Sequence, residues 1–296
     1  MKYAFFPGCA VHSSSKEYGD SCKAICEVLG IELVEIPDWN CCGAIDAVSA
    51  YDPQYSLALV ARNLALAEKM QMDIVTLCSA CYFSLARTNK LFKENNDARS
   101  KITEALSSIG LSYGGNVKVR HFLEVLLTDV GLEKIKAHVK VPLNSFNIAS
   151  YYGCLLVRPI ELANFDDPEH PTRMDELVET LGASKVEYYS KTKCCGASMG
   201  VTDEKVMLEL SKRILLDAKN AGASSVITAC PLCQFNLDAK QKDIESKFKL
   251  KIDLPVLHFT QLMGLAFGID AKKLGLNKNV VSPRKILPQA TEIVAK

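Results

Sequence analysis

The sequence predicts an α/β fold made of two tandem Rossmann-like domains, each with a small, mostly parallel sheet flanked by helices. Three observations support this. Four sequence landmarks occur twice in the same order, short β-rich runs alternate with helical patterns, and 296 residues suffice for two domain cores. Strands that alternate with helices favour parallel βαβ units. We therefore expect a first domain over residues 1–145 and a second over residues 146–296, related by a pseudo-twofold axis.

The duplication is visible in four landmarks that recur in the second half of the chain. In the first half they are FFPGC (Phe5–Cys9), NCCGA (Asn40–Ala44), IVTLCSACYFSL (Ile74–Leu85) and VRHFLEVL (Val119–Leu126). In the second half they are SYYGC (Ser150–Cys154), KCCGA (Lys193–Ala197), VITACPLCQFNL (Val226–Leu237) and VLHFTQLM (Val256–Met263). Four matches in one order argue for a duplicated domain.

The expected strands are short runs rich in β-formers. They are Tyr3–Phe6, Leu33–Ile36, Asp73–Leu77, Phe146–Tyr151, Lys185–Tyr189 and Ser225–Thr228. Two helices are expected from apolar residues that share one face. These residues are Leu57, Val60, Ala61, Leu64 and Ala67 after an Asp52 cap and Pro53, and Met207, Leu210, Ile214 and Ala218 after a Thr202 cap. His121 and His258 are each expected to begin a helix.

Charge and hydropathy exclude several classes of protein. Lys and Arg number 35 against 34 Asp and Glu, with no basic run, which argues against nucleic acid and against an anionic membrane surface. The longest uncharged apolar stretch, Leu254–Ile269, is short for a membrane span and favours a buried helix. The N-terminus enters a predicted strand at once, which leaves no room for a signal peptide. We expect a cytoplasmic protein.

Twelve cysteines are then unusual, because a reducing compartment favours metal or redox chemistry over a disulfide framework. Each half repeats five of them. The ten are Cys9, Cys41, Cys42, Cys78 and Cys81, then Cys154, Cys194, Cys195, Cys230 and Cys233. Most follow predicted strands, where segments converge on one edge of a parallel sheet. The glycine after each cysteine pair indicates a tight loop that directs both sulfurs to one centre.

The number of thiols in each half does not decide which metal or cluster they bind. Structural zinc is the usual meaning of C-x-x-C with distant cysteines, yet zinc takes four ligands, and so does a cubane iron–sulfur cluster. Five thiols per half exceed both needs. Either one thiol per site is spare, or the centre is an unusual cluster.

The cysteine spacing resembles one known family. The pattern is C-x31-CCG-x34-C-x-x-C in the first half and C-x39-CCG-x33-C-x-x-C in the second. It resembles the CCG-domain family, and within that family the heterodisulfide reductase B subunits of methanogenic archaea, of the soluble type. The resemblance covers almost the whole chain and includes all ten repeated cysteines. The second gap between CCG and C-x-x-C is one residue shorter, which is a loop-level difference.

The resemblance implies two non-cubane [4Fe-4S] clusters, with the five thiolates of each half as ligands. It also implies a substrate, the mixed disulfide of coenzyme M and coenzyme B. The chain has no C-x-x-C-x-x-C-x-x-x-C-P motif, so it resembles the stand-alone protein rather than a fusion. The implied partners are a separate ferredoxin-like iron–sulfur protein of the reductase and, through it, the flavin-containing protein of the same complex, together with a hydrogenase or formate dehydrogenase.

Two other interpretations remain beside the disulfide reductase. One is an electron-relay subunit of another oxidoreductase, acting on lactate, glycolate or fumarate. The other is a structural scaffold with zinc in one or both sites. The chain has no flavin or nicotinamide fingerprint, since Gly114-Gly115 is an isolated turn signal.

Residues near the cysteines supply candidate site groups. His12, just after Cys9, is the candidate proton donor. The candidate cations for an anionic substrate are Arg158, Lys191 and Lys193, although a solvated surface charge is the commoner fate of such residues. For His121 and His258 a structural role is favoured over a ligand role. Cys22 and Cys26 lie four apart on a predicted helix, which favours buried apolar residues over additional ligands.

Overall fold

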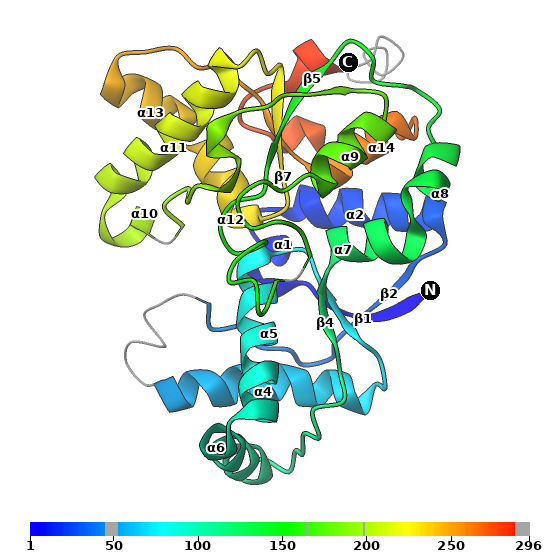
Figure 1. Cartoon of the computed structure of the whole chain (residues 1–296), viewed down its shortest axis with the longest axis vertical. Coiled ribbons are helices and arrows are strands. Elements are labelled where there is room, and N and C mark those ends of the chain that lie inside the picture. Colours follow the sequence, from blue (N-terminus) through cyan, green and yellow to red (C-terminus); the bar gives the residue numbers. More distant parts are fainter. Residues whose placement is uncertain (45–52, 164, 198, 288–296) are drawn as a thin grey trace.

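The computed structural model describes residues 1–44, 53–163, 165–197 and 199–287. It contains two separate four-stranded sheets, each with all its strands parallel, and helices lie on both (Figure 1). The strand orders are β2-β1-β3-β4 and β6-β5-β7-β8, so both halves of the chain repeat one topology. The predicted fold class and the duplication are confirmed.

The strands are β1 (Lys2–Phe6), β2 (Glu32–Glu35), β3 (Ile74–Thr76), β4 (Val119–His121), β5 (Asn147–Tyr151), β6 (Ser184–Lys185), β7 (Ser225–Thr228) and β8 (Val256–His258). The helices of the first half are α1 (Gly8–His12), α2 (Lys16–Leu29), α4 (Pro53–Lys69), α5 (Ser79–Glu94), α6 (Asn96–Ser107), α7 (Phe122–Val125) and α8 (Leu132–Ala137). Those of the second half are α9 (Arg173–Thr180), α10 (Met199–Thr202), α11 (Glu204–Asn220), α12 (Pro231–Gln234), α13 (Gln241–Phe248) and α14 (Phe259–Ala266). The predicted domain boundary falls between β4 and β5.

The fourth strand of each sheet is absent from the sequence prediction. β4 and β8 have only three residues each, and they end at His121 and His258, which then cap the helices α7 and α14. Arg120 and His121 interrupt the apolar run in β4, and β8 is continuous with the apolar stretch of the helix after it, so the sequence predicts only the helix that follows each histidine. The expected buried helix over Leu254–Ile269 is therefore wrong in its first part, where β8 lies.

Three smaller predictions also need correction or limits. β6 is only two residues long, and Tyr189 begins a 3₁₀ turn, Tyr189–Thr192, rather than ending a strand. The cap of α11 is Asp203, whose carboxylate accepts from the Val206 amide, and not Thr202. The helix α4 begins at Pro53 as expected, while Asp52 lies outside the described residues.

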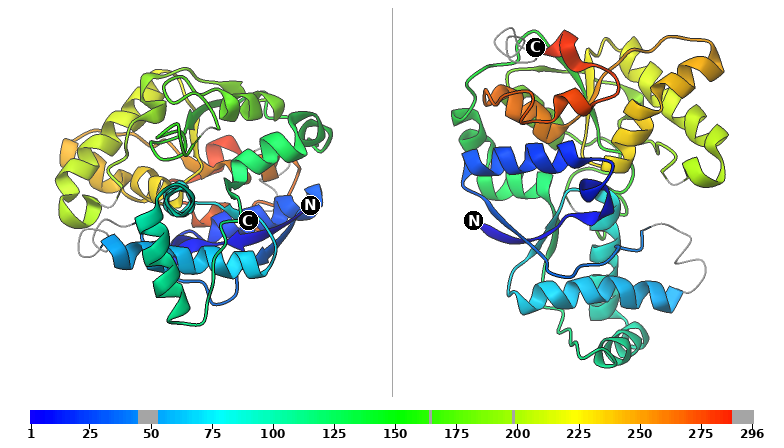
Figure 2. Two further views of the ribbon diagram at one scale, coloured as in Figure 1. Left: turned by 60° about the horizontal axis from the view of Figure 1, so that its bottom comes forward. Right: turned by 180° about the vertical axis from the view of Figure 1, so that it is seen from behind.

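The two domains share a hydrophobic core. One cluster of buried side chains runs from Phe5 and Tyr18 in the first half to Ile227 and Phe259 in the second. In it α2 packs against α14 (Figure 2, right). The helix α8 packs against α9. The two sheets are thus held to each other by apolar packing over a wide area, which fixes their relative position. No helix in the described part of the chain is long and apolar enough to cross a membrane.

Candidate metal centre

The thiols lie where the topology of a parallel sheet predicts. Cys78 directly precedes α5 just after β3, and Cys230 directly precedes α12 just after β7. Cys81 and Cys233 lie in the first turns of those helices. Each C-x-x-C therefore begins a helix at the carboxyl end of a central strand.

Seven of the ten cysteines form one continuous series of sulfur neighbours. In order the series is Cys41, Cys42, Cys81, Cys78, Cys230, Cys233 and Cys195. The Sγ atoms of Cys195 and Cys233 are 3.5 Å apart. The Sγ atoms of Cys78 and Cys230, which come from different domains, are 4.0 Å apart. The two repeated thiol sets therefore meet across the domain interface.

The remaining three thiols lie beside this series. Cys154 and Cys194 form a pair of their own through a hydrogen bond. Cys9 is exposed and lies close enough to Cys41 to act on its charge. The exposed thiols Cys9, Cys41 and Cys194 mark where solvent reaches the centre in each half.

The repeated CCGA segments hold their thiols in the same way. In the second half the amides of Gly196 and Ala197 donate to the sulfurs of Cys194 and Cys195, both at 3.4 Å. In the first half the corresponding amides, of Gly43 and Ala44, donate to Cys41 and Cys42. Gly43 and Gly196 have φ angles of 63° and 92°, a region that favours glycine. The predicted tight loop is confirmed, and its amides stabilise thiolates.

A second pair of glycines lets the first cysteine loop of each half approach the C-x-x-C thiols. Gly8 has a φ of +69°, and a Cβ there would lie 3.0 Å from the Cys81 sulfur. Gly153 has a φ of +68°, and a Cβ there would lie 3.5 Å from the Cys233 sulfur. The backbone of each loop thus lies close to a C-x-x-C sulfur, and a side chain at Gly8 would press against the Cys81 thiol.

Hydrogen bonding between sulfurs divides the thiols into two kinds. Hydrogen bonds from Cys41 and Cys81 lower the pKa of Cys42 to about 4, and the Cys154 thiol lowers the pKa of Cys194 to about 6. Cys233 and Cys78 likewise lower the pKa of Cys230. In the other thiols, hydrogen bonds to neighbouring sulfurs and burial raise the pKa. These thiols are Cys41, Cys78, Cys81, Cys154 and Cys233.

This division bears on which group the thiols fit. Adjacent buried thiols cannot all ionise unless positive charge lies among them. No three His, Cys, Asp or Glu side chains of the described residues are arranged as ligands of a single metal ion. Five soft sulfur donors per half suit a multinuclear, positively charged iron–sulfur unit. On donor chemistry, the residues fit such a group.

The two repeated histidines have different surroundings. The Nε2 atom of His121 lies 3.1 Å from the Leu77 carbonyl and 2.9 Å from the Ala229 carbonyl, while its Nδ1 accepts from the Leu123 amide. Burial lowers the pKa of His121 to about 4, so the ring is neutral at neutral pH. His258 is stacked on Tyr18 at 3.8 Å, and its Nε2 lies 3.7 Å from a Glu17 carboxylate oxygen. The favoured structural role suits the contacts of both.

The candidate proton donor His12 lies on the surface at the end of α1. Its Nε2 is 3.2 Å from a Glu35 carboxylate oxygen, and its ring packs against Trp39, which lies beside the first CCG. Trp39 also packs edge-on against Phe6. His12 is thus held close to the first cysteine loop and remains open to solvent.

The three candidate cations differ in how far they are already paired. Arg158 donates to the Pro168 carbonyl, to Glu169 and to the Thr192 hydroxyl. Lys191 is buried, with its ammonium 2.7 Å from an oxygen of Asp175, whose side chain is 1% exposed. The Lys191 carbonyl also accepts from the amides of Tyr152 and Gly153, just before Cys154. These contacts assign Lys191 to holding the Cys154 loop.

Lys193 is the exposed member of the three. Its ammonium lies 4.5 Å from the centre of the Tyr189 ring and donates to the Tyr189 hydroxyl at 3.3 Å. Since it adjoins Cys194 and pairs with no carboxylate in the described part of the chain, it is the candidate that an anion can reach.

Cys22 and Cys26 follow the favoured prediction. Both are buried in α2 within the shared core, and burial together with a bond to Cys26 raises the pKa of Cys22. They pack as small apolar residues.

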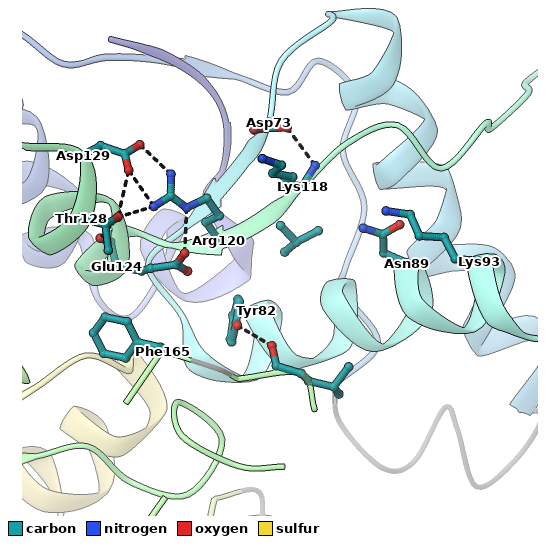
Figure 3. A pocket seen from close by; sticks show the side chains of 12 residues that line it. Asp73, Tyr82, Asn89, Lys93, Lys118, Arg120, Glu124, Thr128, Asp129 and Phe165 are labelled. Atoms are coloured by element: carbon teal, nitrogen blue, oxygen red, sulfur yellow. Dashed lines mark hydrogen bonds and ion pairs between the residues drawn. The ribbon is translucent and has the colours of Figure 1, made fainter. Parts of the chain in front are cut away.

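A surface pocket of about 660 Å³ lies beside β4 and α5. Figure 3 shows Arg120 directed at Glu124 and Asp129 at one end, and Asn89 and Lys93 at the other. Arg120 is 2.9 Å from Glu124 and 2.6 Å from Asp129, so its guanidinium is already paired with two carboxylates. Charged and apolar side chains both line the pocket, and it has no sulfur among its lining residues.

Comparison with known proteins places the chain in a family. The family model of the CCG cysteine-rich domain matches twice, over residues 3–86 and 148–238. The chain is 39% identical over 285 residues to the 8-methylmenaquinol:fumarate reductase membrane anchor subunit of Wolinella succinogenes, covering 96% of this chain and 99% of that one. It is 35% identical over 296 residues to the B subunit of the ferredoxin/F420H2-dependent CoB-CoM heterodisulfide reductase of Methanosarcina acetivorans, covering 99% and 98%.

A solved structure supports the fold. A hypothetical protein from Helicobacter pylori superposes with a TM-score of 0.76 at 15% identity, over 95% of this chain and 52% of the other. The family model matches both halves, and the relatives align along nearly the full length of the chain. The chain therefore belongs to a class of iron–sulfur redox subunits that contain a duplicated cysteine-rich domain. The chain belongs to the CCG family.

Proposed function

We propose that this chain is the catalytic redox subunit of a disulfide reductase, with the coenzyme M–coenzyme B heterodisulfide as substrate. The observation that carries the proposal is the contact between Cys78 and Cys230, which brings the thiol sets of both domains together. Each thiol set would hold one non-cubane [4Fe-4S] cluster through its five cysteines. The likeness to heterodisulfide reductase B subunits supports the choice of substrate.

Two adjacent redox centres suit the reaction. Reducing a disulfide consumes two electrons and two protons, breaks one S–S bond and releases two thiols. Iron–sulfur clusters supply electrons one at a time, so two neighbouring clusters meet the requirement without release of a thiyl radical.

The chain's own residues would bind the substrate and supply protons. Lys193 is exposed beside Cys194, and it would bind a sulfonate, phosphate or carboxylate of the substrate. His12 stands open to solvent next to the first cysteine loop, where an imidazole transfers protons near neutral pH. Arg158 and Lys191 would position the Cys154 and Cys194 loops through the contacts described above.

The electrons would come from partner proteins. We infer a ferredoxin-like iron–sulfur protein, a flavin-containing protein and a hydrogenase or formate dehydrogenase, in a cytoplasmic complex. The names of the relatives, which are subunits of larger enzymes, support an assembly of this kind.

One relative favours a second candidate function. The 39% identity to a fumarate reductase subunit supports an electron-relay subunit that passes electrons between a membrane or flavin partner and another active site. In a relay the same thiols would hold clusters, but no thiol substrate would bind to them.

The first experiment is an assay of iron, sulfide and zinc on anaerobically purified protein, with electron paramagnetic resonance before and after coenzyme M is added under oxidising conditions. About eight iron atoms per chain and a thiol-dependent signal are expected for two substrate-binding clusters. Iron together with an electron paramagnetic resonance signal that does not change when coenzyme M is added would favour the electron-relay function. Zinc with little iron would return the chain to the scaffold interpretation.

Mutation tests the two-cluster scheme directly. Cys42→Ser or Cys195→Ser is expected to abolish heterodisulfide reduction, because each change removes a ligand from one set. Cys26→Ser is the matched control, since Cys26 is a buried cysteine outside both sets. Full turnover in either ligand variant would contradict the scheme.

A further inference from the structure

One buried imidazole joins the two cysteine loops at the domain interface. The Nδ1 atom of His121 accepts from the Leu123 amide, and a neutral imidazole that accepts at one nitrogen carries its proton on the other. Nε2–H therefore donates to both carbonyls within reach, at 3.1 Å to Leu77 and 2.9 Å to Ala229. These two residues directly precede Cys78 and Cys230.

The position of these carbonyls makes the contact specific. Leu77 belongs to the first domain and Ala229 to the second, so one N–H group connects two chain segments of different sheets. Ser79 adds a weaker contact of the same kind, from its hydroxyl to the Ala229 carbonyl at 3.3 Å. The sulfurs that follow the two carbonyls are the pair at 4.0 Å.

The repeat supplies a natural comparison. His258 occupies the corresponding place at the end of β8, but its Nε2 lies 3.7 Å from a Glu17 carboxylate oxygen within the first half, and its ring stacks on Tyr18. The duplicated histidines have thus diverged. Of the two histidines, His121 is the one whose ring bonds to both cysteine loops.

We propose that His121 is a positioning residue that sets the separation of Cys78 and Cys230, and through it the coupling between the redox centres of the two domains. The coupling part rests on the proposed function, whereas the separation of the thiols does not. A loss of the Nε2–H donor is expected to let the two loops move apart while each domain keeps its own thiol pairs.

The variants follow from the cap geometry. His121→Asn keeps a side-chain acceptor for the first turn of α7, because Asn is a good N-cap residue, but it is too short to reach the two carbonyls. His121→Gln restores an N–H donor at nearly the original length. His258→Asn is the matched control at the corresponding cap.

The test uses metal-free, reduced full-length protein and dibromobimane, which becomes fluorescent when it bridges two nearby thiols. Each thiolate displaces one bromide, so two S–C bonds form, two bromide ions leave and no oxidant is needed. Peptide mass spectrometry then gives the yield of the Cys78–Cys230 bridge relative to the Cys195–Cys233 bridge. The second pair, at 3.5 Å within one domain, is an internal standard for reagent access and folding.

His121→Asn is expected to lower the ratio by about fivefold, the factor that one net hydrogen bond represents, while His121→Gln and His258→Asn keep it near the original value. An unchanged ratio in His121→Asn would overturn the proposal. So would an equal loss in His258→Asn. If His121→Asn fails to fold, His121→Gln alone is decisive. A Cys78–Cys230 bridge yield in folded His121→Gln that is as low as in urea-unfolded protein would overturn the proposal as well.

A second measurement separates this inference from the proposed function. In protein loaded with iron and sulfide, the magnetic interaction between the two centres is expected to weaken in His121→Asn and to return in His121→Gln. Loaded protein with uncoupled centres in the original sequence would contradict the coupling. The bimane ratio would then still decide whether His121 sets the thiol separation.

Discussion

Gly8 is the position where the structure makes the sharpest prediction about the site. It precedes Cys9, has a φ of +69°, and a Cβ added there would lie 3.0 Å from the Cys81 sulfur. Two other glycines share its conformation but not its surroundings. A Cβ at Gly30, with φ +70°, would meet nothing within 4 Å, and one at Gly153, with φ +68°, would meet the Cys233 sulfur at an ordinary 3.5 Å.

The expected cost of each alanine can be worked out from these distances. All three substitutions place a Cβ in the left-handed region, which costs about 1–2 kcal/mol. Gly30→Ala and Gly153→Ala should lose only this amount of the free energy of unfolding. Gly8→Ala must in addition displace Cys81, which is 4% exposed, and overpacking of this kind costs about 1–3 kcal/mol more.

The assay is urea unfolding of the reduced, metal-free protein, monitored by far-ultraviolet circular dichroism. The free energies of unfolding of the three variants are compared with one common m value, the slope of that free energy against urea concentration. Iron content after reconstitution is the second readout, and it should fall in Gly8→Ala because the Cys81 sulfur is displaced. If Gly8→Ala is no less stable than Gly30→Ala and binds as much iron, the close approach of Gly8 to the Cys81 sulfur does not constrain this position, and the reasoning is wrong.

Two further predictions concern buried charge. Burial raises the pKa of Asp238 to about 6, above the unfolded value of 3.8, so its contribution to stability is present below pH 4 and is lost as the pH rises through 6. The free energy of unfolding should therefore fall by about 3 kcal/mol from this group over that range, and Asp238→Asn should remove this part of the slope, which unfolding at a series of pH values will show. Lys191→Met should lower stability by about 3–5 kcal/mol because Asp175 is left buried without its partner, whereas the exposed Lys193→Met should change it by less than about 0.5 kcal/mol. Equal losses in the two lysine variants, measured by urea unfolding, would contradict a stabilising role for the buried Lys191–Asp175 ion pair.

The sequence by itself determined the repeated architecture and the cysteine set. The two CCGA segments and the two C-x-x-C segments predicted a duplicated α/β fold because strand ends and tight loops are local features, encoded in neighbouring residues. The strands β4 and β8 were not predicted because Arg120 and His121 interrupt the apolar run in β4, and because β8 is continuous with the apolar stretch of α14. Their place in the sheet depends on the pairing of β4 with β3 and of β8 with β7.

Only the tertiary structure decided how the two halves meet. Cys78 and Cys230 are 152 positions apart, and His121 and Ala229 are 108 apart, so no local pattern connects them. Their contacts result from the apolar packing of α2 on α14 and of α8 on α9, which sets one domain against the other. The same packing made His121 a link between the cysteine loops and left His258 against Tyr18, although both histidines stand in the same repeated motif.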